Sequence, residues 1–236
     1  MRCAPRSNYA IAPNVAAMSG PGISESQYLD PTVDLDLYRI EVPIVDARDP
    51  AAAVLAIVAD DPETFDVPIV PWPVDGGRAL DPGTGIEGAT VVGSFDCAWQ
   101  DDRLNAINAA VGGRYVIGWA PPEQRGTAGA PDTVLLWHLD HHPDGGQLFW
   151  SPDGRPFLVP AVPVGEDPDL DQVVGLYSDG SFGVCLRPGV WHDGVYPIGG
   201  DGNFLTRQGR VHARVSCDLA AEYGRLLEVP LRCPAT

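Results

Sequence analysis

The histidines of the chain are concentrated in one short stretch. Three of the five lie between His138 and His142, in the sequence HLDHHPDGGQLFW, together with Asp140 and, slightly later, Gln147. A fourth, His192, follows a Pro-Gly pair fifty residues after His142. Imidazoles, a carboxylate and an amide oxygen can bind a divalent first-row metal ion, and they can equally bind a polar substrate. The stretch is therefore either one edge of a binding site or a polar turn between two strands.

The alternation of side chains along a strand decides which of these groups can share a site. Alternate residues face the same side, so Asp140 and His142 would point to one face and His141 to the other. A hairpin would return Gln147 beside them, and a more distant strand would bring His192 to the same place. These four side chains are the candidate site.

Several of these residues also have a purely structural interpretation. Asp140 could cap a turn, and Gln147 could satisfy strand backbone instead of a ligand. His138 is expected at most to contact and orient the site residues, without touching a ligand itself. His212, in VHARVSC, is interpreted as a strand-surface or core residue.

The composition favours an all-β fold with a few short helices. Of 236 residues 44% are hydrophobic, and 27 Gly and 24 Pro are spread along the chain, which is typical of many short strands joined by turns. Strands are predicted at YRIEVPIVDA, ATVVGSF, RYVIGW, TVLLWHL, GQLFWS, RPFLVPAVPV, FGVCL, FLTR and VHARVSC.

Two short helices are also predicted. One is DPAAAVLAIVA, with Asp49 as N-cap and Pro50 in the first helical position. The other is DDRLNAINAAVGG, ended by Gly112. Neither is long enough to serve as the crossover of a parallel sheet. We therefore expect an antiparallel sheet, closed or nearly closed, as a jelly roll or small barrel.

The charge and the cysteines exclude several classes of partner. A net charge of -17 argues against nucleic acid and against an anionic membrane surface. No apolar run approaches a membrane span, and the first residues lack the apolar stretch of a signal peptide. Five widely spaced cysteines make a disulfide framework or structural zinc site unexpected. We expect a cytoplasmic protein with a mobile tail over residues 1–28 and a single domain over 29–236.

Two motifs resemble the signature motifs of the cupins, a jelly-roll superfamily. In the first, His142, Gln147 and Gly154 have the spacing of the last His, the Glu and the Gly of the cupin pattern. In the second, a Pro-Gly turn precedes His192. Glutamine in place of the usual cupin Glu gives a weaker and more ambiguous set of metal ligands. The resemblance implies a cupin-like antiparallel jelly-roll barrel.

A narrower resemblance rests on DHHPDGGQLFWSPDGRPFLVPAVP, GVWHDGVYPI and the FLT that follows. These runs look like those of the ureidoglycolate lyase family, which read roughly acidic-x-His-Pro-x-Gly-x-Gln-x-Phe, Gly-Val-x-Trp-His and Phe-Leu-Thr. The match covers residues 133–220 well and 29–130 only loosely. It implies release of urea from ureidoglycolate to give glyoxylate, a homodimer, and a divalent metal (Ni, Mn, Zn or Fe) with no organic cofactor.

The resemblance also implies roles for the candidate residues. Asp140, His142 and His192 are the expected catalytic residues. The expected metal ligands are His142, Gln147 and His192, with Asp140 as a further candidate. A metal there would polarise the α-hydroxy-carboxylate of the substrate. A carboxylate or imidazole could take the hydroxyl proton while the C–N bond breaks.

Some positions depart from the family pattern. Arg187 stands where members usually carry a His, and we expect it to bind a small-molecule carboxylate substrate, beside Gln147 and with Trp191 and Trp150 as pocket walls. The Asp-Arg pair expected after FLT is replaced by Gln208-Gly209, with the Arg one place along.

Two alternatives stay open. One is an enzyme of the same fold on a larger carboxylate, such as a lactonase, isomerase or decarboxylase, and the Arg187 replacement favours it. The other is a non-catalytic cupin that binds a sugar or small acid.

Overall fold

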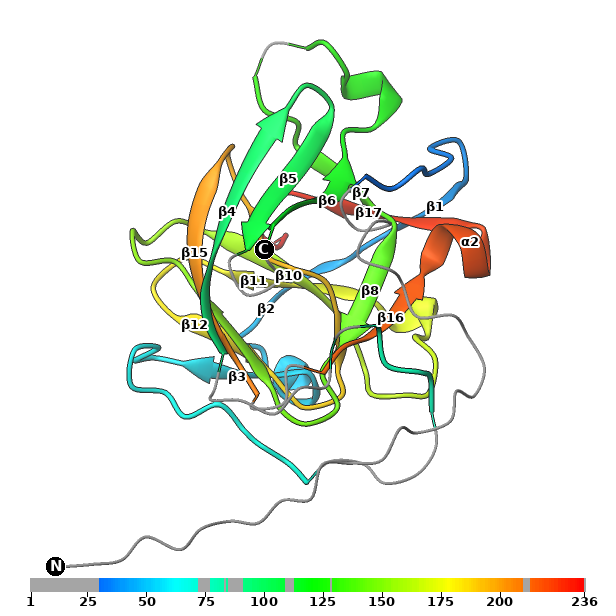
Figure 1. Cartoon of the computed structure of the whole chain (residues 1–236). Helices are drawn as coiled ribbons and strands as arrows, with labels where there is room; N and C mark the ends of the chain where they lie inside the picture. Colours follow the sequence, from blue (N-terminus) through cyan, green and yellow to red (C-terminus); the bar gives the residue numbers. More distant parts are fainter. Residues whose placement is uncertain are drawn as a thin grey trace, which may run out of the picture.

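The fold consists of two β-sheets, seen in a computed structural model that describes residues 30–71, 77–82, 84, 91–108, 113–127, 129–209 and 213–235 (Figure 1). The larger sheet has ten strands in the order β1 (Tyr38–Glu41), β17 (Arg225–Pro230), β7 (Thr133–Leu136), β6 (Gly113–Trp119), β5 (Arg103–Asn108), β4 (Val91–Gln100), β15 (Gly202–Gln208), β9 (Gln147–Trp150), β12 (Gly183–Leu186) and β3 (Ala56–Ala59).

The smaller sheet has seven strands. Six follow the order β16 (Val215–Asp218), β8 (His138–His141), β13 (Trp191–His192), β10 (Phe157–Val162), β11 (Val174–Ser178) and β2 (Ile44–Asp46), and β14 (Tyr196–Pro197) pairs with β10. The helical elements are short: η1 (Pro50–Val54), η3 (Pro122–Gln124), η4 (Leu170–Gln172) and α2 (Leu219–Tyr223). No helix in the described ranges has the length and apolar character that crossing a bilayer requires.

The predicted all-β class is confirmed, with two qualifications. The pairing is antiparallel except for β1 with β17 and β2 with β11, which run parallel. In the described part of the chain neither strand order returns to its first strand, so no closed barrel forms.

Aromatic side chains join the two sheets. The rings of Phe157 in β10 and Phe204 in β15 lie 5.4 Å apart, edge to face. Phe149 in β9 approaches the ring of His192 in β13, at 6.5 Å between centroids. Since each pair takes one residue from each sheet, the sheets face each other across a common core. The candidate site lies between the two sheets, beside that core.

Trp137 marks the point where the chain passes from one sheet to the other. The predicted strand TVLLWHL is divided there, because residues 133–136 pair in the larger sheet and residues 138–141 in the smaller one. The indole is buried and donates to the backbone carbonyl of Val116 at 3.3 Å. This crossing puts the histidine cluster opposite β9.

The first helix prediction is correct only at its start. Asp49 caps η1 by accepting from the backbone N–H of Ala51, but the helix ends at Val54. The residues that follow, Ala56–Ala59, form β3 against β12. Pairing at a sheet edge therefore overrides the helical tendency of the alanine-rich sequence.

The second helix prediction is wrong. Residues 103–108 form β5 between β4 and β6, after a turn at Asp101, whose φ is 55°. Leu104 and Ala106 are buried while Arg103 and Ile107 are exposed, and a register shift between Leu104 and Asn105 accompanies the burial of Asn105. Gly112, the predicted C-cap, lies outside the described residues, as do the predicted tail, Arg210 and His212.

Candidate active site

Strand β8 brings Asp140 and His192 together. Asp140 pairs with Ser216 of β16 on one side and with His192 of β13 on the other. Residues directly opposite each other in a sheet point to the same face. The His192 Nε2 accordingly lies 3.6 Å from Asp140 Oδ1. The pairing of β13 with β8 thus brings together two motifs that lie fifty residues apart in the sequence.

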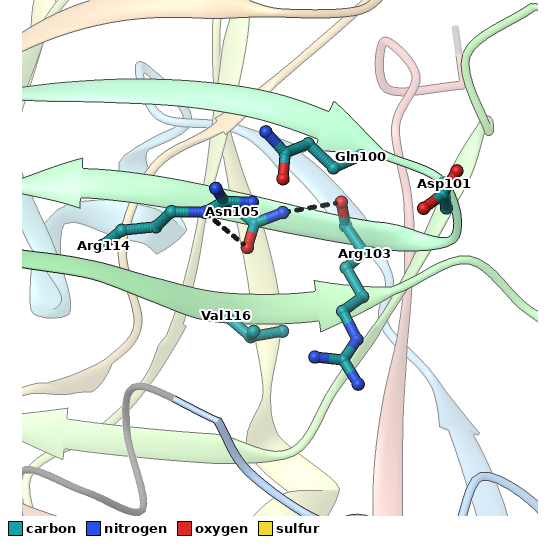
Figure 2. A pocket seen from close by; sticks show the side chains of 6 residues that line it. All are labelled: Gln100, Asp101, Arg103, Asn105, Arg114 and Val116. Atoms are coloured by element: carbon teal, nitrogen blue, oxygen red, sulfur yellow. Dashed lines mark hydrogen bonds between the residues drawn. The ribbon is translucent and has the colours of Figure 1, made fainter.

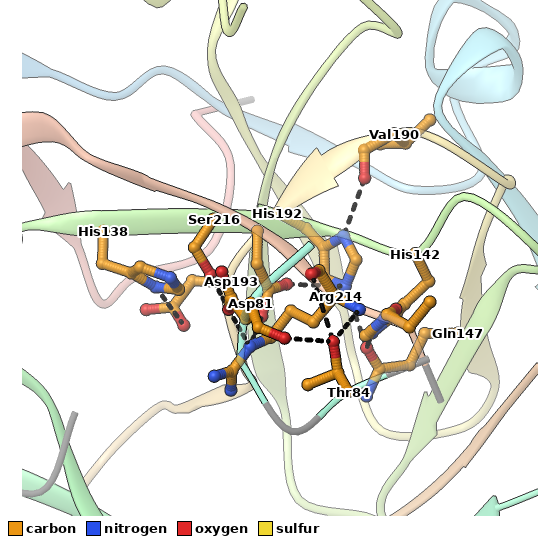
Figure 3. A network of polar contacts seen from close by, with 12 residues as sticks. Asp81, Thr84, His138, His142, Gln147, Val190, His192, Asp193, Arg214 and Ser216 are labelled. Carbon is orange, nitrogen blue, oxygen red and sulfur yellow. Dashed lines mark hydrogen bonds and ion pairs between the residues drawn. The ribbon is translucent and has the colours of Figure 1, made fainter. Parts of the chain in front are cut away.

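Strand β9 of the facing sheet supplies Gln147 (Figure 3). Its Oε1 lies 2.8 Å from the Nε2 atoms of both His142 and His192. Its Nε2 donates to Thr206 Oγ1 at 3.0 Å, which fixes the direction of the amide. The exposed fractions of His142, Gln147 and His192 are 5%, 4% and 2%. The four predicted residues therefore converge at a buried point between the sheets.

The two imidazoles are oriented by backbone carbonyls. His142 Nδ1 lies 2.8 Å from the carbonyl oxygen of Ala213, and His192 Nδ1 lies 2.8 Å from that of Val190. A carbonyl oxygen only accepts, so in a neutral ring Nδ1 carries the proton and Nε2 keeps its lone pair. Burial lowers the pKa of His192 to about 4, against the opposing effect of Asp140, so this ring is neutral at pH 7.

These groups form a set of donors that suits a cation. The ligand atoms of Asp140, His142 and His192 all lie within 4.8 Å of one another. Burial raises the pKa of Asp140, but the charges of His192, His142, His138 and Arg214 outweigh it and hold that pKa below its ordinary value. In the tautomer that the Nδ1 contacts favour, the Nε2 lone pairs of both imidazoles point toward the Gln147 oxygen. A divalent ion among them would be bound by all, with one carboxylate in the set.

A guanidinium that the sequence analysis did not identify lies at the edge of this set. Arg214 Nε is 2.5 Å from Asp81 Oδ2 and 4.0 Å from Asp140 Oδ2. Asp81 is buried and also accepts from the Ser216 hydroxyl. Alternation in VHARVSC would have placed Arg214 on the same face as Ser216. The pairing of Arg214 with Asp81 could not be predicted, because Asp81 lies in LDPGTG, a segment without periodicity.

The three other predicted binding residues lie elsewhere. Arg187 follows Leu186, which faces Gln147, and its exposed guanidinium donates from Nε to the carbonyl of Ala53 at 2.7 Å. Trp191 precedes His192 and donates to the carbonyl of Gly165 at 3.0 Å. Trp150 packs in a separate apolar cluster, which also contains Ala59, Leu148 and Cys185. The structure does not bring these three side chains to the convergent group.

The two remaining histidines of the cluster take different places. His141 packs edge-on against Trp191, with ring centroids 4.4 Å apart, on the side of β8 away from Asp140. Burial lowers the pKa of His141 to about 3. His138 lies within the core, its Nδ1 3.8 Å from Asp193 Oδ1. Asp193 also accepts from the Tyr196 hydroxyl, so a buried polar row continues inward from the site.

A separate surface pocket of about 490 Å³ contains none of these residues (Figure 2). Two of its polar side chains already have partners, because Asn105 Nδ2 donates to the carbonyl of Arg103 and Arg114 Nε donates to Asn105 Oδ1. The residues that line it are Gln100, Asp101, Arg103, Asn105, Arg114 and Val116. The convergent group is chemically the better candidate for an active site.

Comparison with known proteins locates the similarity in the same part of the chain. Residues 112–223 match the ureidoglycolate lyase family. The chain is 38% identical over 88 residues to a ureidoglycolate lyase of Azotobacter vinelandii, which is 37% of this chain and 52% of that protein. It is 36% identical to the ureidoglycolate lyase of Pseudomonas savastanoi pv. phaseolicola and 40% to that of Pseudomonas putida, each over 75 residues.

The extent of the match sets what it establishes. The 75-residue alignments cover 32% of this chain and 44% of each relative, so the chain spans about half the length of the relatives it matches. The matched segment contains Asp140, His142, Gln147 and His192, and also Arg214. The resemblance seen in the motifs is confirmed for residues 112–223, slightly less than half of the chain, which match the ureidoglycolate lyase family.

Proposed function

We propose that the protein cleaves ureidoglycolate to urea and glyoxylate. The observation that carries this proposal is the convergence of Asp140, two imidazole lone pairs and the Gln147 oxygen inside the segment that matches the family. The relatives are lyases by name, which supports a lyase here.

The proposed metal ligands are Asp140, His142 and His192, with Gln147 as a fourth. When bound, a divalent ion would act as a Lewis acid toward the α-hydroxy-carboxylate. The neutral state of His192 supports this role, since an imidazole binds a metal only through an unprotonated nitrogen.

In the proposed reaction Asp140 moves one proton. Its carboxylate accepts the proton of the substrate hydroxyl, the C–O bond becomes the aldehyde of glyoxylate, and the C–N bond breaks. The proton then passes to the nitrogen that leaves as urea, so atoms and charges balance. Asp140 is suited to this because its low pKa keeps it ionised before substrate arrives.

Arg214 takes the role of substrate-carboxylate receptor that Arg187 was expected to have. Its guanidinium is held by Asp81 and lies within 4.0 Å of Asp140, whereas that of Arg187 is bonded to Ala53 on the outside. A guanidinium fork can bind a carboxylate through two hydrogen bonds. We propose in addition a cytoplasmic homodimer, as the family resemblance implies, which light scattering of the purified protein would test.

The test is release of urea and glyoxylate from racemic ureidoglycolate, with Mn²⁺, Ni²⁺, Zn²⁺ or Fe²⁺ supplied in turn. His192→Ala should abolish turnover while circular dichroism stays unchanged. His141→Phe is the matched control, because that ring lies on the other side of β8, and it should keep its activity. A folded His192→Ala protein with full activity would show that the site is wrong. An inactive, metal-loaded wild type would move the search to larger hydroxy acids.

A further inference from the structure

Gln208 is a buried polar side chain that the proposed reaction does not use. It ends β15 and has an exposed fraction of 4%. Within the described residues its Nε2 has no hydrogen-bond partner. Such a donor is costly in a folded protein unless something accepts from it. In an enzyme interior, a ligand can be that acceptor.

The strand register places Gln208 on the face of the site. Gln208 lies directly opposite Gln147 in the pairing of β15 with β9, so both side chains point to the same side. Thr206, two residues earlier on the same face, accepts from the Gln147 amide. The alternate residue Arg207 faces the other way, over the ring of Trp150. Gln208 is therefore the next inward group along the row that contains Thr206.

Two glycines allow the end of β15 to lie close to the loop between His142 and Gln147. A Cβ on Gly145 would come within 2.9 Å of the Gly209 Cα, and a Cβ on Gly209 would come within 2.6 Å of Asp144 Oδ2. Only residues without a side chain allow such an approach. Gln208 is consequently fixed beside the same loop as two of the proposed metal ligands.

We propose that Gln208 Nε2 donates a hydrogen bond to the ureido carbonyl oxygen of the substrate. This inference rests on the proposed function, because it names the ligand group that the same site selects. The charged groups Asp140 and Arg214 suit the hydroxyl and carboxylate end of such a molecule. An uncharged amide donor suits the uncharged carbonyl at the other end, so Gln208 is a specificity residue for 2-substituted acids that carry a ureido or carbamoyl group.

The test compares two stable carboxylates that differ only in the ureido group. Ureidoacetate and acetate are titrated into wild-type protein and into Gln208→Leu, in the same Mn²⁺-containing buffer, by calorimetry. Wild type should bind ureidoacetate more tightly than acetate. Gln208→Leu should weaken ureidoacetate binding roughly 3- to 10-fold, the usual worth of one hydrogen bond, and leave acetate binding unchanged.

Two further variants keep the result interpretable. Gln208→Glu keeps the size of the side chain but removes the donor, so it too should lose the preference for ureidoacetate. Arg207→Gln, on the outer face of the same strand, should bind both ligands as wild type does. Within the described residues Gln208 Nε2 has no hydrogen-bond partner, so the loss of this donor in Gln208→Leu should not lower the melting temperature. A lower melting temperature with an unchanged ligand preference would assign Gln208 a structural role and overturn the inference.

The outcomes separate this inference from the proposed function. Turnover of ureidoglycolate with an unchanged KM in Gln208→Leu overturns the inference and leaves the function standing. Ureidoacetate binding that depends on Gln208, in a protein that does not cleave ureidoglycolate, supports the inference and overturns the function. A wild type that binds ureidoacetate no better than acetate overturns the inference in either case.

Discussion

Gln147 is the residue on which the ligand chemistry of the site depends most directly. Its oxygen faces two imidazole nitrogens while its NH₂ group donates to Thr206. If the Gln147 amide were rotated by half a turn, its NH₂ group would donate to both rings and no oxygen would face a cation. The hydrogen bond to Thr206 holds the orientation with the oxygen inward, which is the orientation that a divalent ion would require.

Gln147→Glu should therefore tighten divalent metal binding. The carboxylate is nearly isosteric, needs no particular orientation and adds a negative charge beside the two imidazoles. Affinity should rise roughly tenfold or more, which corresponds to at least about 1.4 kcal/mol. Isothermal titration with Mn²⁺ measures this, and Gln147→Leu is the control that should lose affinity. Equal affinities in all three proteins would mean that Gln147 is not a ligand.

His141 governs a pH dependence that is independent of the reaction. Its Nδ1 is buried without a hydrogen-bond partner in the described residues, and its pKa falls from 6.5 to about 3 on burial. Below pH 6.5 His141 is protonated in the unfolded chain but stays neutral in the folded protein. The free energy of unfolding therefore falls as the pH drops from 6.5 toward 3.

His141→Phe should flatten this dependence while preserving the ring contact with Trp191. Thermal unfolding in EDTA, between about pH 7 and about pH 5, should give a smaller loss of melting temperature in the variant than in wild type. At pH 7 the variant should be at least as stable, because an unpaired buried nitrogen is removed. The same loss of melting temperature in both proteins would assign the pH dependence to other groups, His192 among them.

At the scale of elements, the site depends on how closely β9 approaches β12. Gly146 lies directly before β9, and a Cβ added there would come within 2.3 Å of the backbone oxygen of Leu186. A backbone atom in a paired strand cannot move away at low cost. The glycine is therefore required for Gln147 to reach the imidazoles.

Gly146→Ala should lower the free energy of unfolding by roughly 1–3 kcal/mol, as overpacking does elsewhere, and should weaken Mn²⁺ binding. Chemical denaturation and metal titration measure the two effects. Gly194→Ala is the matched control, since its Cβ would meet the nearest atom of Phe95 at an ordinary 3.5 Å. If Gly146→Ala binds metal as wild type does, β9 is not positioned by this contact.

The elements also show what the sequence could and could not predict. Alternation along β8 and the spacing to Gln147 and His192 predicted the convergent group, because these depend on local strand geometry. The helix predicted over 101–113 failed because the composition of residues 103–108 suits both states and only pairing with β4 and β6 decides between them. Arg214 was missed because its partner Asp81 is 133 residues away in an aperiodic segment.

At the scale of the molecule, the segment that matches the family does not build the site alone. Asp81, which holds Arg214, precedes the matched residues 112–223. So do β3 and β4, which pair with β12 and β15 in the larger sheet. The part of the chain outside the match therefore contributes both a contact at the site and strands that support β9 and β15.

The charge of the whole chain gives a last prediction. With 32 acidic residues against 15 arginines, the net charge of -17 makes the average pair of surface charges repulsive in the folded state. Salt screens this repulsion, so the melting temperature should rise between about 20 mM and about 300 mM NaCl, by roughly 2–4 °C for each 1 kcal/mol gained. Differential scanning calorimetry in EDTA measures the rise, and KCl should give the same curve because screening does not distinguish the two cations. A flat or falling curve would mean that specific ion pairs, such as that of Arg78 with Glu222 and Asp167, outweigh the general repulsion.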